Sequence, residues 1–452
     1  MKKSLLAVAA LGAFASAAQA QSSVTVYGVL DVGYVGGNTR VANQGTATAS
    51  TVSGTGVTNS NYSSFTDGAE STSRLGFKGT EDLGGGMSAF FTVETALTPD
   101  LQNAISSSTG TANRQSFAGL KKNGIGQFAF GTQYTTIHNA VAASDPGMQN
   151  NMMGNVIYDK FSGIGANQGN AAGSTAQASG TNVGTYNLSG MQNNTSYTVR
   201  ANNMLSVNSD TFAGFQGNAF YVLSSANTNQ TAPTTGTTGS GSGGSTSHTA
   251  WGLGANYTWQ KLFVTANYQN FTDKTPYTIN TTTGAYASGT PVMNGWGGTS
   301  VQGTNARDNQ QYYAATYDFG ILKAYVQYVN RKTMDANNSN MYVARTAQQI
   351  GVRSFITPTV EAWASTGTGK YTVSTSQNGN SFVSLPAGVF AAGASNAATF
   401  GGFQLGSNYW LSKRTNLYAI YGQQRQSNQI YFSGNPTSYN MNNYALGMRH
   451  TF

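Results

Sequence analysis

Five basic residues fall on segments in which apolar residues occupy alternate positions. Arg74 and Lys78, for example, alternate with Leu75 and Phe77. If the apolar face contacts lipid, an Arg or Lys on it at mid-depth costs about 2–4 kcal/mol, so the basic residues belong on the opposite face. Cations that line a narrow aqueous channel focus the electric field and attract anions. The candidates for such a cationic ladder are Arg74, Lys78, Arg114, Arg353 and Arg449. The alternative for each is a solvated residue with little effect on ions.

The segment 137–190 carries two acidic candidates. Loops of about 50 residues are uncommon in compact domains unless they are functional. Asp145 and Asp159 are its only acids, and Lys160 is its only Lys or Arg. Asp145 could set the local field of a channel, or it could cap the turn that Pro146-Gly147 begins, as Asp often does. The sequence leaves both interpretations of Asp145 open.

Residue sets for enzymatic chemistry are missing from the sequence. The three histidines, His138, His248 and His450, are far apart in sequence and show no HExxH or comparable spacing. No GxSxG elbow and no GxxxxGK[ST] phosphate loop occur. His450 also shares the face of the apolar residues in the last segment. We therefore expect no catalytic residue, no metal site and no cofactor.

The N-terminus reads as a secretory leader that occupies residues 1–20. Lys2 and Lys3 form a basic region, residues 5–14 are mostly apolar, and Ala18-Gln19-Ala20 is a small-residue cleavage site. No later segment offers about 18 consecutive apolar residues, so no transmembrane helix is expected. The chain has no cysteine, and its formal charge of +8 is modest and dispersed, which argues against nucleic-acid binding. Residues 21–452 show no linker and read as one unit.

Composition and periodicity favour a barrel that faces lipid outside and water inside. Charged residues make up only 8% of the chain and aromatic residues 12%, which suits strands with aromatic girdles at two membrane interfaces. The fold class is therefore all-β, and tilted strands of this length can cross a bilayer. The sixteen candidate strands are residues 23–36, 70–81, 87–98, 113–122, 125–136, 191–199, 211–224, 247–260, 262–273, 308–319, 321–332, 343–356, 358–370, 399–412, 415–427 and 441–452. In 415–427, either Tyr418 and Ile420 or Leu417, Ala419 and Tyr421 could face lipid.

Short and long connections alternate between these strands. Short ones such as Asn123-Gly124 supply the positive φ of tight hairpins. Long ones are rich in Gly, Ser, Thr, Asn and Ala, as in residues 37–69 and 137–190. This alternation is typical of outer-membrane barrels, whose long loops are extracellular and whose short turns are periplasmic.

The segment Ser73–Gly86, SRLGFKGTEDLGGG, resembles the general porins of Gram-negative bacteria, particularly the beta-proteobacterial type. Further segments are similar to the first, fourth, fifth and last strands of that family. They are Ser23–Gly28, Arg114–Leu120, Phe128–Tyr134, Leu411–Tyr418 and Tyr444–Phe452. The resemblance spans the whole chain after the leader.

The resemblance implies a sixteen-stranded antiparallel barrel, usually a homotrimer, whose third loop folds inward and narrows the pore. Arg74, Lys78 and Arg114 would be wall residues, and Asp145 and Asp159 would belong to the constriction loop. Two positions of the family's basic ladder are not basic here, because Thr132 and Gln192 stand where the family often has Arg. The implied partners are outer-membrane lipid, lipopolysaccharide and the assembly machinery that reads a C-terminal strand ending in Phe452.

We therefore expect a passive outer-membrane pore for small hydrophilic solutes and ions, with a weak preference for anions. A substrate-specific channel remains an alternative, as does an adhesin whose barrel is plugged by its long loops. An outer-membrane enzyme is disfavoured by the spacing of the histidines.

Overall fold

The computed structural model describes residues 23–43, 47–48, 51–52, 56–101, 113–159, 192–228, 244–275, 304–336, 341–377, 380–381, 397–427 and 437–452. The leader expected at residues 1–20 lies outside these ranges and stays a prediction. In the described part of the chain no helix is both long and apolar enough to cross a membrane.

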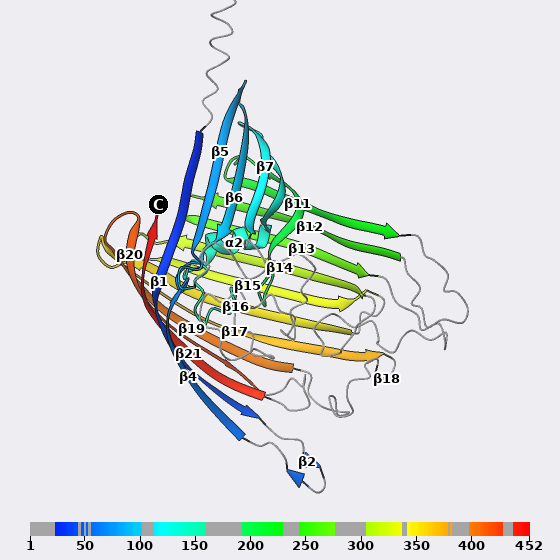
Figure 1. Cartoon of the computed structure of the whole chain (residues 1–452), viewed down its shortest axis with the longest axis vertical. Coiled ribbons are helices and arrows are strands. Elements are labelled where there is room, and N and C mark those ends of the chain that lie inside the picture. Colours follow the sequence, from blue (N-terminus) through cyan, green and yellow to red (C-terminus); the bar gives the residue numbers. More distant parts are fainter. Residues whose placement is uncertain are drawn as a thin grey trace, which may run out of the picture.

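The strands form one closed antiparallel barrel of sixteen strands (Figure 1). The first strand, β1 (Ser23–Asn43), closes the barrel by pairing with the last, β21 (Thr437–Thr451). On its other side β1 pairs with β4 (Gly56–Asp67) and β5 (Arg74–Gly84), which together make one interrupted barrel strand.

The remaining barrel strands follow in chain order, each paired with the next. They are β6 (Met87–Ala96), β7 (Asn113–Lys122), β8 (Gly126–Tyr134), β10 (Thr198–Ser209), β11 (Phe215–Thr228), β12 (Gly244–Trp259), β13 (Leu262–Thr275), β14 (Thr304–Asp318), β15 (Lys323–Asp335), β16 (Met341–Phe355), β17 (Val360–Gln377), β19 (Ala397–Trp410) and β20 (Thr415–Gln426). The described chain also contains the helix α2 (Thr136–Ser144) and four two-residue strands, β2 (Ala47–Thr48), β3 (Thr51–Val52), β9 (Gln192–Asn193) and β18 (Asn380–Ser381).

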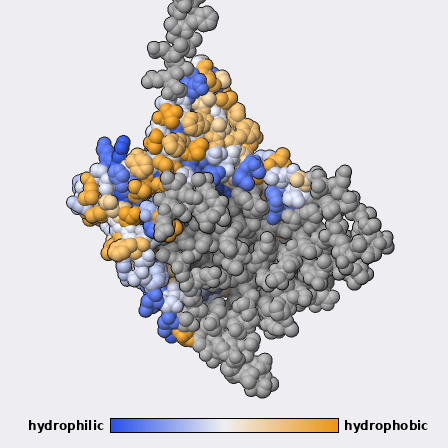
Figure 2. All heavy atoms as spheres, viewed as in Figure 1, coloured by the Kyte–Doolittle hydropathy of each residue, from blue (hydrophilic) through white to orange (hydrophobic). Residues whose placement is uncertain are grey.

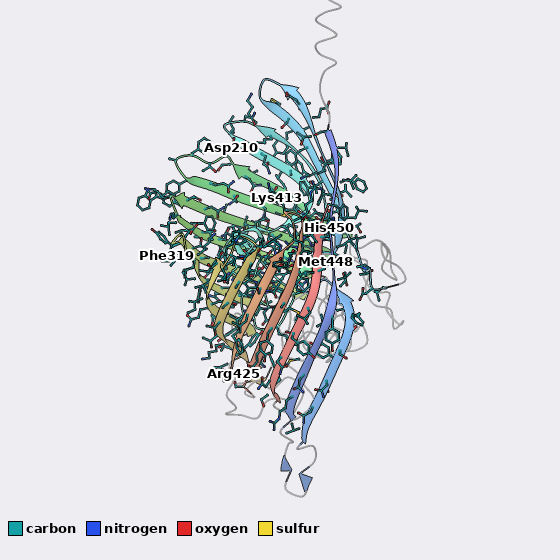
Figure 3. All side chains as sticks on the ribbon, turned by 90° about the vertical axis from the view of Figure 1, so that its left-hand side faces the viewer. Asp210, Phe319, Lys413, Arg425, Met448 and His450 are labelled. Atoms are coloured by element: carbon teal, nitrogen blue, oxygen red, sulfur yellow. The ribbon has the colours of Figure 1, made fainter. Side chains whose placement is uncertain are left out.

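The two faces of the barrel wall differ in polarity, in the sense expected for a membrane barrel. On β21, Leu446 is 57% exposed on the outer face, whereas Asn443 on the inner face is fully buried. Met448 and His450 lie along the same strand (Figure 3). Figure 2 shows apolar residues gathered on the outer surface over β5 to β7. Polar side chains inside and apolar side chains outside are the reverse of a soluble core and suit a lipid environment.

The structure settles the faces of the strand predicted at 415–427. Leu417 and Tyr421 are exposed on the outer face of β20, and Tyr418 and Ile420 are each 3% exposed on the inner face. Tyr418 faces inward because its hydroxyl donates a hydrogen bond of 2.6 Å to Asp31 on β1.

Several strands, among them β1 and β17, run past their predicted ends, and two further predictions are wrong. The sixth strand was expected at 191–199, but β10 spans Thr198–Ser209. The side chain of Asn194 accepts hydrogen bonds from the backbone N–H groups of Ser196 and Tyr197, a local turn that breaks the strand there. The second wrong prediction is the loop 37–69, because the strand β4 lies within it. Its Ser, Asn and Thr residues read as loop, yet its backbone pairs fully with β1.

Candidate functional site: the barrel interior

The helix α2 follows β8 directly and lies within the ring of strands (Figure 1). Its first turn is capped by the Thr135 hydroxyl, which accepts a hydrogen bond from the His138 backbone N–H. At its other end the hydroxyls of Ser144 and of Tyr312 on β14 are 2.6 Å apart. The helix therefore rests against the inner face of the wall.

Residues 145–159 continue from α2 and contact inward-facing amide side chains of four strands. Gln349 on β16 accepts a hydrogen bond from the Val156 N–H, and Gln404 on β19 donates to the Met153 carbonyl. Further contacts reach Gln424 on β20 and Asn443 on β21. Every residue from 150 to 159 is buried. The segment is thus bonded to the wall along most of its described length.

Asp145 lies between this segment and the wall. Its carboxylate accepts hydrogen bonds from the Gln149 N–H at 2.7 Å, from Asn155 at 3.0 Å and from Gln349 at 3.2 Å, and the residue is 3% exposed. Burial raises the pKa of Asp145 to about 6, although the hydrogen bonds oppose that shift. The turn that Pro146-Gly147 begins is present, with the Met148 N–H bonded to the Asp145 carbonyl. Asp145 therefore caps a turn and also contacts the wall.

Asp159 and three arginines of β15 and β16 tie the neighbouring backbone to the wall. Arg345 binds the Asp159 carboxylate at 2.9 Å and the Val156 carbonyl at 2.8 Å. Arg331 pairs with Asp308 at 2.6 Å and also donates to the Asn194 carbonyl. The third, Arg353, forms a two-pronged pair with Glu361 and donates to the Pro146 carbonyl at 2.7 Å. Planar guanidinium groups suit such multiple contacts.

Arg331 and Arg345 are absent from the set of sequence candidates, although they face each other in register on β15 and β16. The sequence does contain a signal for them. Each arginine stands an even number of residues from a buried glutamine on its own strand, Gln327 or Gln349, and therefore shares its inward face. The sequence cannot show that a loop returns to meet them. Arg200 on β10 was missed as well, and it lies 5.6 Å from the centre of the Tyr134 ring.

A second basic cluster lies on β5 and β7, where the structure brings Arg74, Lys78 and Arg114 around Tyr27 and Glu94. Arg114 pairs with Glu94 at 2.7 Å, and Glu94 also accepts a hydrogen bond from the Tyr27 hydroxyl at 3.0 Å. The Lys78 ammonium lies 5.4 Å from the centre of the Tyr27 ring. Arg74 donates to the Ser71 hydroxyl at 2.8 Å. Arg114 therefore pairs with the buried carboxylate of Glu94, and Arg74 and Lys78 contact other groups of the same part of the wall.

Arg449 on β21 contacts one carboxylate and one aromatic ring. Its Nε atom is 3.6 Å from the Glu70 carboxylate, and its guanidinium is 5.6 Å from the centre of the Trp410 ring. Within the described ranges no group of three or more His, Asp or Glu residues could hold a metal ion.

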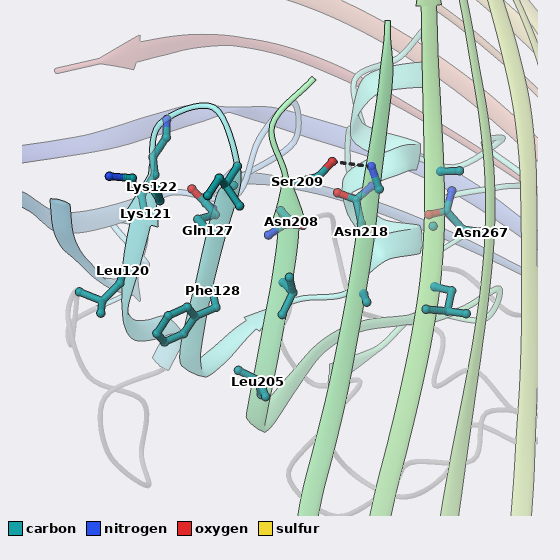
Figure 4. Close-up of a pocket in the computed structure, with 18 of the residues that line it drawn as sticks. Leu120, Lys121, Lys122, Gln127, Phe128, Leu205, Asn208, Ser209, Asn218 and Asn267 are labelled. Carbon is teal, nitrogen blue, oxygen red and sulfur yellow. Dashed lines mark hydrogen bonds between the residues drawn. The ribbon is translucent and has the colours of Figure 1, made fainter. Parts of the chain in front are cut away.

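Near β8 to β13 each face of the wall has a cavity, and the two cavities differ in the polarity of their lining. A cavity of about 510 Å³ beside α2 is lined mainly by polar residues, among them Gln127, Asn139 and Asn256. A groove of about 1090 Å³ includes the outward-facing Phe130, Val207 and Leu253, together with residues shown in Figure 4. The polar cavity belongs to the aqueous side, and the apolar lining of the groove is unsuited to hydrophilic solutes.

A sequence model of the Gram-negative porin family matches residues 7–429. The chain belongs to the Gram-negative porin family. This porin is therefore a β-barrel protein of the outer membrane of a Gram-negative bacterium. Proteins of its family are channels rather than enzymes.

Named relatives of this porin are porins of beta-proteobacteria. It is 35% identical over 178 residues to an outer membrane porin protein of Bordetella pertussis, an alignment that covers 36% of this chain and 43% of the relative. Identity to outer membrane porin protein 32 of Delftia acidovorans is 32% over 236 residues, or 52% of this chain and 54% of the relative. The chain spans about half the length, or less, of these relatives.

Solved structures share the fold of this porin over nearly the whole chain. An anion-selective porin from Comamonas acidovorans has a TM-score of 0.56 at 18% identity, covering 96% of this chain and 100% of that one. OmpT of Vibrio cholerae, in a trimer form, has a TM-score of 0.52 at 15% identity, covering 95% and 99%. At such identities the likeness concerns the fold alone.

Proposed function

We propose that this porin forms a water-filled channel through which small hydrophilic solutes and ions diffuse, with a weak preference for anions. The observation that carries the anion preference is the cluster of Arg74, Lys78 and Arg114 on the inner wall, in which Arg114 pairs with Glu94 while Arg74 contacts the Ser71 hydroxyl and Lys78 the Tyr27 ring. Unbalanced positive charge in a narrow lumen raises the local concentration of anions.

In this proposal the two basic groups have different roles. Arg331, Arg345 and Arg353 are each paired with a carboxylate and bind backbone carbonyls, so their charge is largely offset. Lys78 is exposed, and in the described part of the chain Arg74 contacts the Ser71 hydroxyl and Lys78 the Tyr27 ring rather than a carboxylate. We assign the attraction of anions to the β5–β7 cluster, and the holding of residues 136–159 to the arginines of β15 and β16.

Residues 136–159 are proposed to be part of an inward-folded third loop that narrows the pore. Support comes from their contacts with inner-face side chains on β14, β16, β19, β20 and β21. Asp145 and Asp159 then act mainly by fixing this segment, because both are almost fully buried. Arg449 and its neighbour Glu70 would line the wall near β21.

The assembly is proposed to be a homotrimer embedded in outer-membrane lipid and lipopolysaccharide. The likeness to a protein solved in a trimer form supports this assembly. Recognition of Phe452 by the outer-membrane assembly machinery is part of the same proposal.

The test is single-channel conductance of the purified protein in planar bilayers, with a salt gradient. We expect stepwise conductance, commonly in threes, with a reversal potential on the anion side. Lys78→Gln should move the reversal potential toward cations, because it removes an exposed charge of this cluster. Lys413→Gln, which removes the same charge at an exposed turn, should leave it unchanged. A clear cation preference of the unaltered protein would contradict the proposal.

One alternative function has an observation in its favour. The extensive bonding of residues 145–159 to the wall would also suit a barrel that is plugged and acts as an adhesin. Bilayers that stay silent with correctly folded protein, identified by heat-modifiable migration on gels, would favour the plugged barrel over the channel.

A further inference from the structure

Four glycines of the inner wall lie directly beneath the segment 146–156. They stand on four successive strands of the barrel, and we call them the glycine track. A Cβ atom added to Gly351 would lie 2.5 Å from Pro146 Cγ, and one on Gly402 would lie 2.6 Å from the Gly154 carbonyl oxygen. Added Cβ atoms on Gly367 and Gly422 would contact Val156 and the Met153 carbonyl even more closely. Carbon contacts in proteins are normally about 3.5–4.0 Å.

Backbone conformation does not require glycine at these positions. None of the four has a φ in the left-handed region, and all lie within regular strands. Glycine inside a strand costs about 0.5–1 kcal/mol relative to Ala, so its use there needs another reason. Close approach of another backbone is such a reason. Here that backbone belongs to the segment that follows α2.

Amide side chains flank the glycine track in register. Gly367 is paired with Gln349, and Gly402 with Gln424. Gly422 is paired with Gln404 on one side and with Asn443 on the other. All four amides are at most 1% exposed and hydrogen-bond to residues 145–159. In this part of the wall the glycines leave room for the loop backbone, and the amides paired with them hydrogen-bond to the loop.

Gln404 makes the most extensive of these contacts. Its amide exchanges two hydrogen bonds with the Asn150 amide, at 3.0 and 3.1 Å. The Gln404 Nε2 atom, whose two hydrogens are shared among three acceptors, also lies 2.8 Å from the Met152 carbonyl oxygen and 2.7 Å from that of Met153. These bonds hold the loop at the point where Gly154, with a φ of +96°, turns against β19.

We infer that the glycine track and Gln404 set how deeply residues 146–156 sit in the barrel wall, and thereby the free cross-section of the pore. This inference rests on the proposed channel function. The four glycines and Gln404 are positioning residues, since they act through the loop and not on the passing solute. A methyl group at Gly402 or Gly422 must push the loop by about 1–2 Å toward the barrel axis to regain a normal contact.

The first test replaces glycines of the track by alanine and compares the pores of the variants with those of the unaltered protein. Gly402→Ala combined with Gly422→Ala should lower the single-channel conductance and the size of neutral sugar that passes in liposome swelling. The matched control is Gly401→Ala. Gly401 directly precedes Gly402 on β19 and lies on the other face of the strand. Its nearest contact would be an ordinary 3.4 Å. A mere loss of stability would not change the conductance of those channels that do fold.

A second test releases the loop without adding bulk, so it stays informative if the alanine variants fail to fold. Gln404→Ala should give larger or fluctuating conductance levels, because the hydrogen bonds between the Gln404 amide and the loop are lost. The control is Gln423→Ala, on the exposed face of β20. Unaltered conductance in folded Gln404→Ala and in the glycine variants would overturn the inference. Silent bilayers with the unaltered protein would instead overturn the proposed channel.

Discussion

Arg114 reaches the interior because of a local irregularity in pairing. The pairing of β6 with β7 shifts between Glu94 and Thr95, so that Glu94 pairs with Gln115 and Thr95 with Asn113. Arg114 is left as the extra residue of a bulge, which can re-aim a side chain. Strict alternation from the exposed Leu120 on the same strand would place it outside. Alternation alone would therefore not give the inward position that was expected for Arg114, and the bulge turns the side chain inward.

Asp145 should make stability depend on pH. Its pKa in the folded protein is about 6, above the ordinary carboxyl value of about 3.9, so the folded state binds the proton more tightly than the unfolded state. The free energy of unfolding should therefore rise as the pH falls through 6, by about 1 kcal/mol between pH 7 and pH 5. Urea titrations at the two pH values check this.

Other carboxyl groups titrate in the same range, so the informative quantity is the difference from Asp145→Asn. That variant should lose this part of the pH dependence. The reversal potential of the unaltered channel should also move further toward anions at pH 5, as a negative charge disappears. A pH dependence equal in both proteins would contradict the role given to Asp145.

The segment 136–159 depends on anchors contributed by distant strands. Arg345 on β16 joins the Val156 carbonyl, the Ser196 hydroxyl and the Asp159 carboxylate, and all of these groups are buried. Local hydrogen bonds shape the turns of this segment, but they lie within it and do not attach it to the barrel. Its position follows from where inward-facing side chains meet across the barrel.

Arg345→Leu should destabilise the protein by about 3–5 kcal/mol, because it leaves the buried Asp159 without its cationic partner. Arg345→Lys should be intermediate, since Lys keeps the charge but not the planar fork. Urea midpoints of folded protein in vesicles measure both variants. Arg425→Leu is the control, because Arg425 is exposed on β20. Equal effects at positions 345 and 425 would show that the anchor does not stabilise the protein.

The whole barrel inverts the usual arrangement of a soluble protein. Large apolar side chains such as Ile350 and Leu446, at 60% and 57% exposed, cover the outside, and buried glutamines fill positions on the inside. Closure of the sheet through β1 and β21 leaves no long open edge, which is what a bilayer requires.

Leu446→Lys therefore distinguishes a lipid-facing surface from a water-facing one. In water, a substitution at such an exposed position would change stability by less than about 0.5 kcal/mol. In a bilayer the free energy of unfolding should fall by about 2–4 kcal/mol if the site lies near mid-depth. Urea titration in phospholipid vesicles measures the change, with Ser412→Lys at an exposed turn as control. A negligible effect at position 446 would place it outside the hydrocarbon layer.

The sequence by itself determined the architecture. Period-two alternation decides which face of a strand meets lipid, and it sufficed for β15 and β21. It did not suffice where local hydrogen bonding overrides alternation, as at the Asn194 turn before β10, or where polar strands resemble loops, as in β4.

Only the tertiary structure decided how the interior is built. The sequence offered Arg74, Lys78, Arg114, Asp145 and Asp159 as separate candidates, but it could not pair them. Asp159 meets Arg345 across 186 residues of chain, and Asn150 meets Gln404 across 254. Such contacts depend on barrel closure and strand register, which are set by every strand together and by no local pattern. The glycine track depends on the same register.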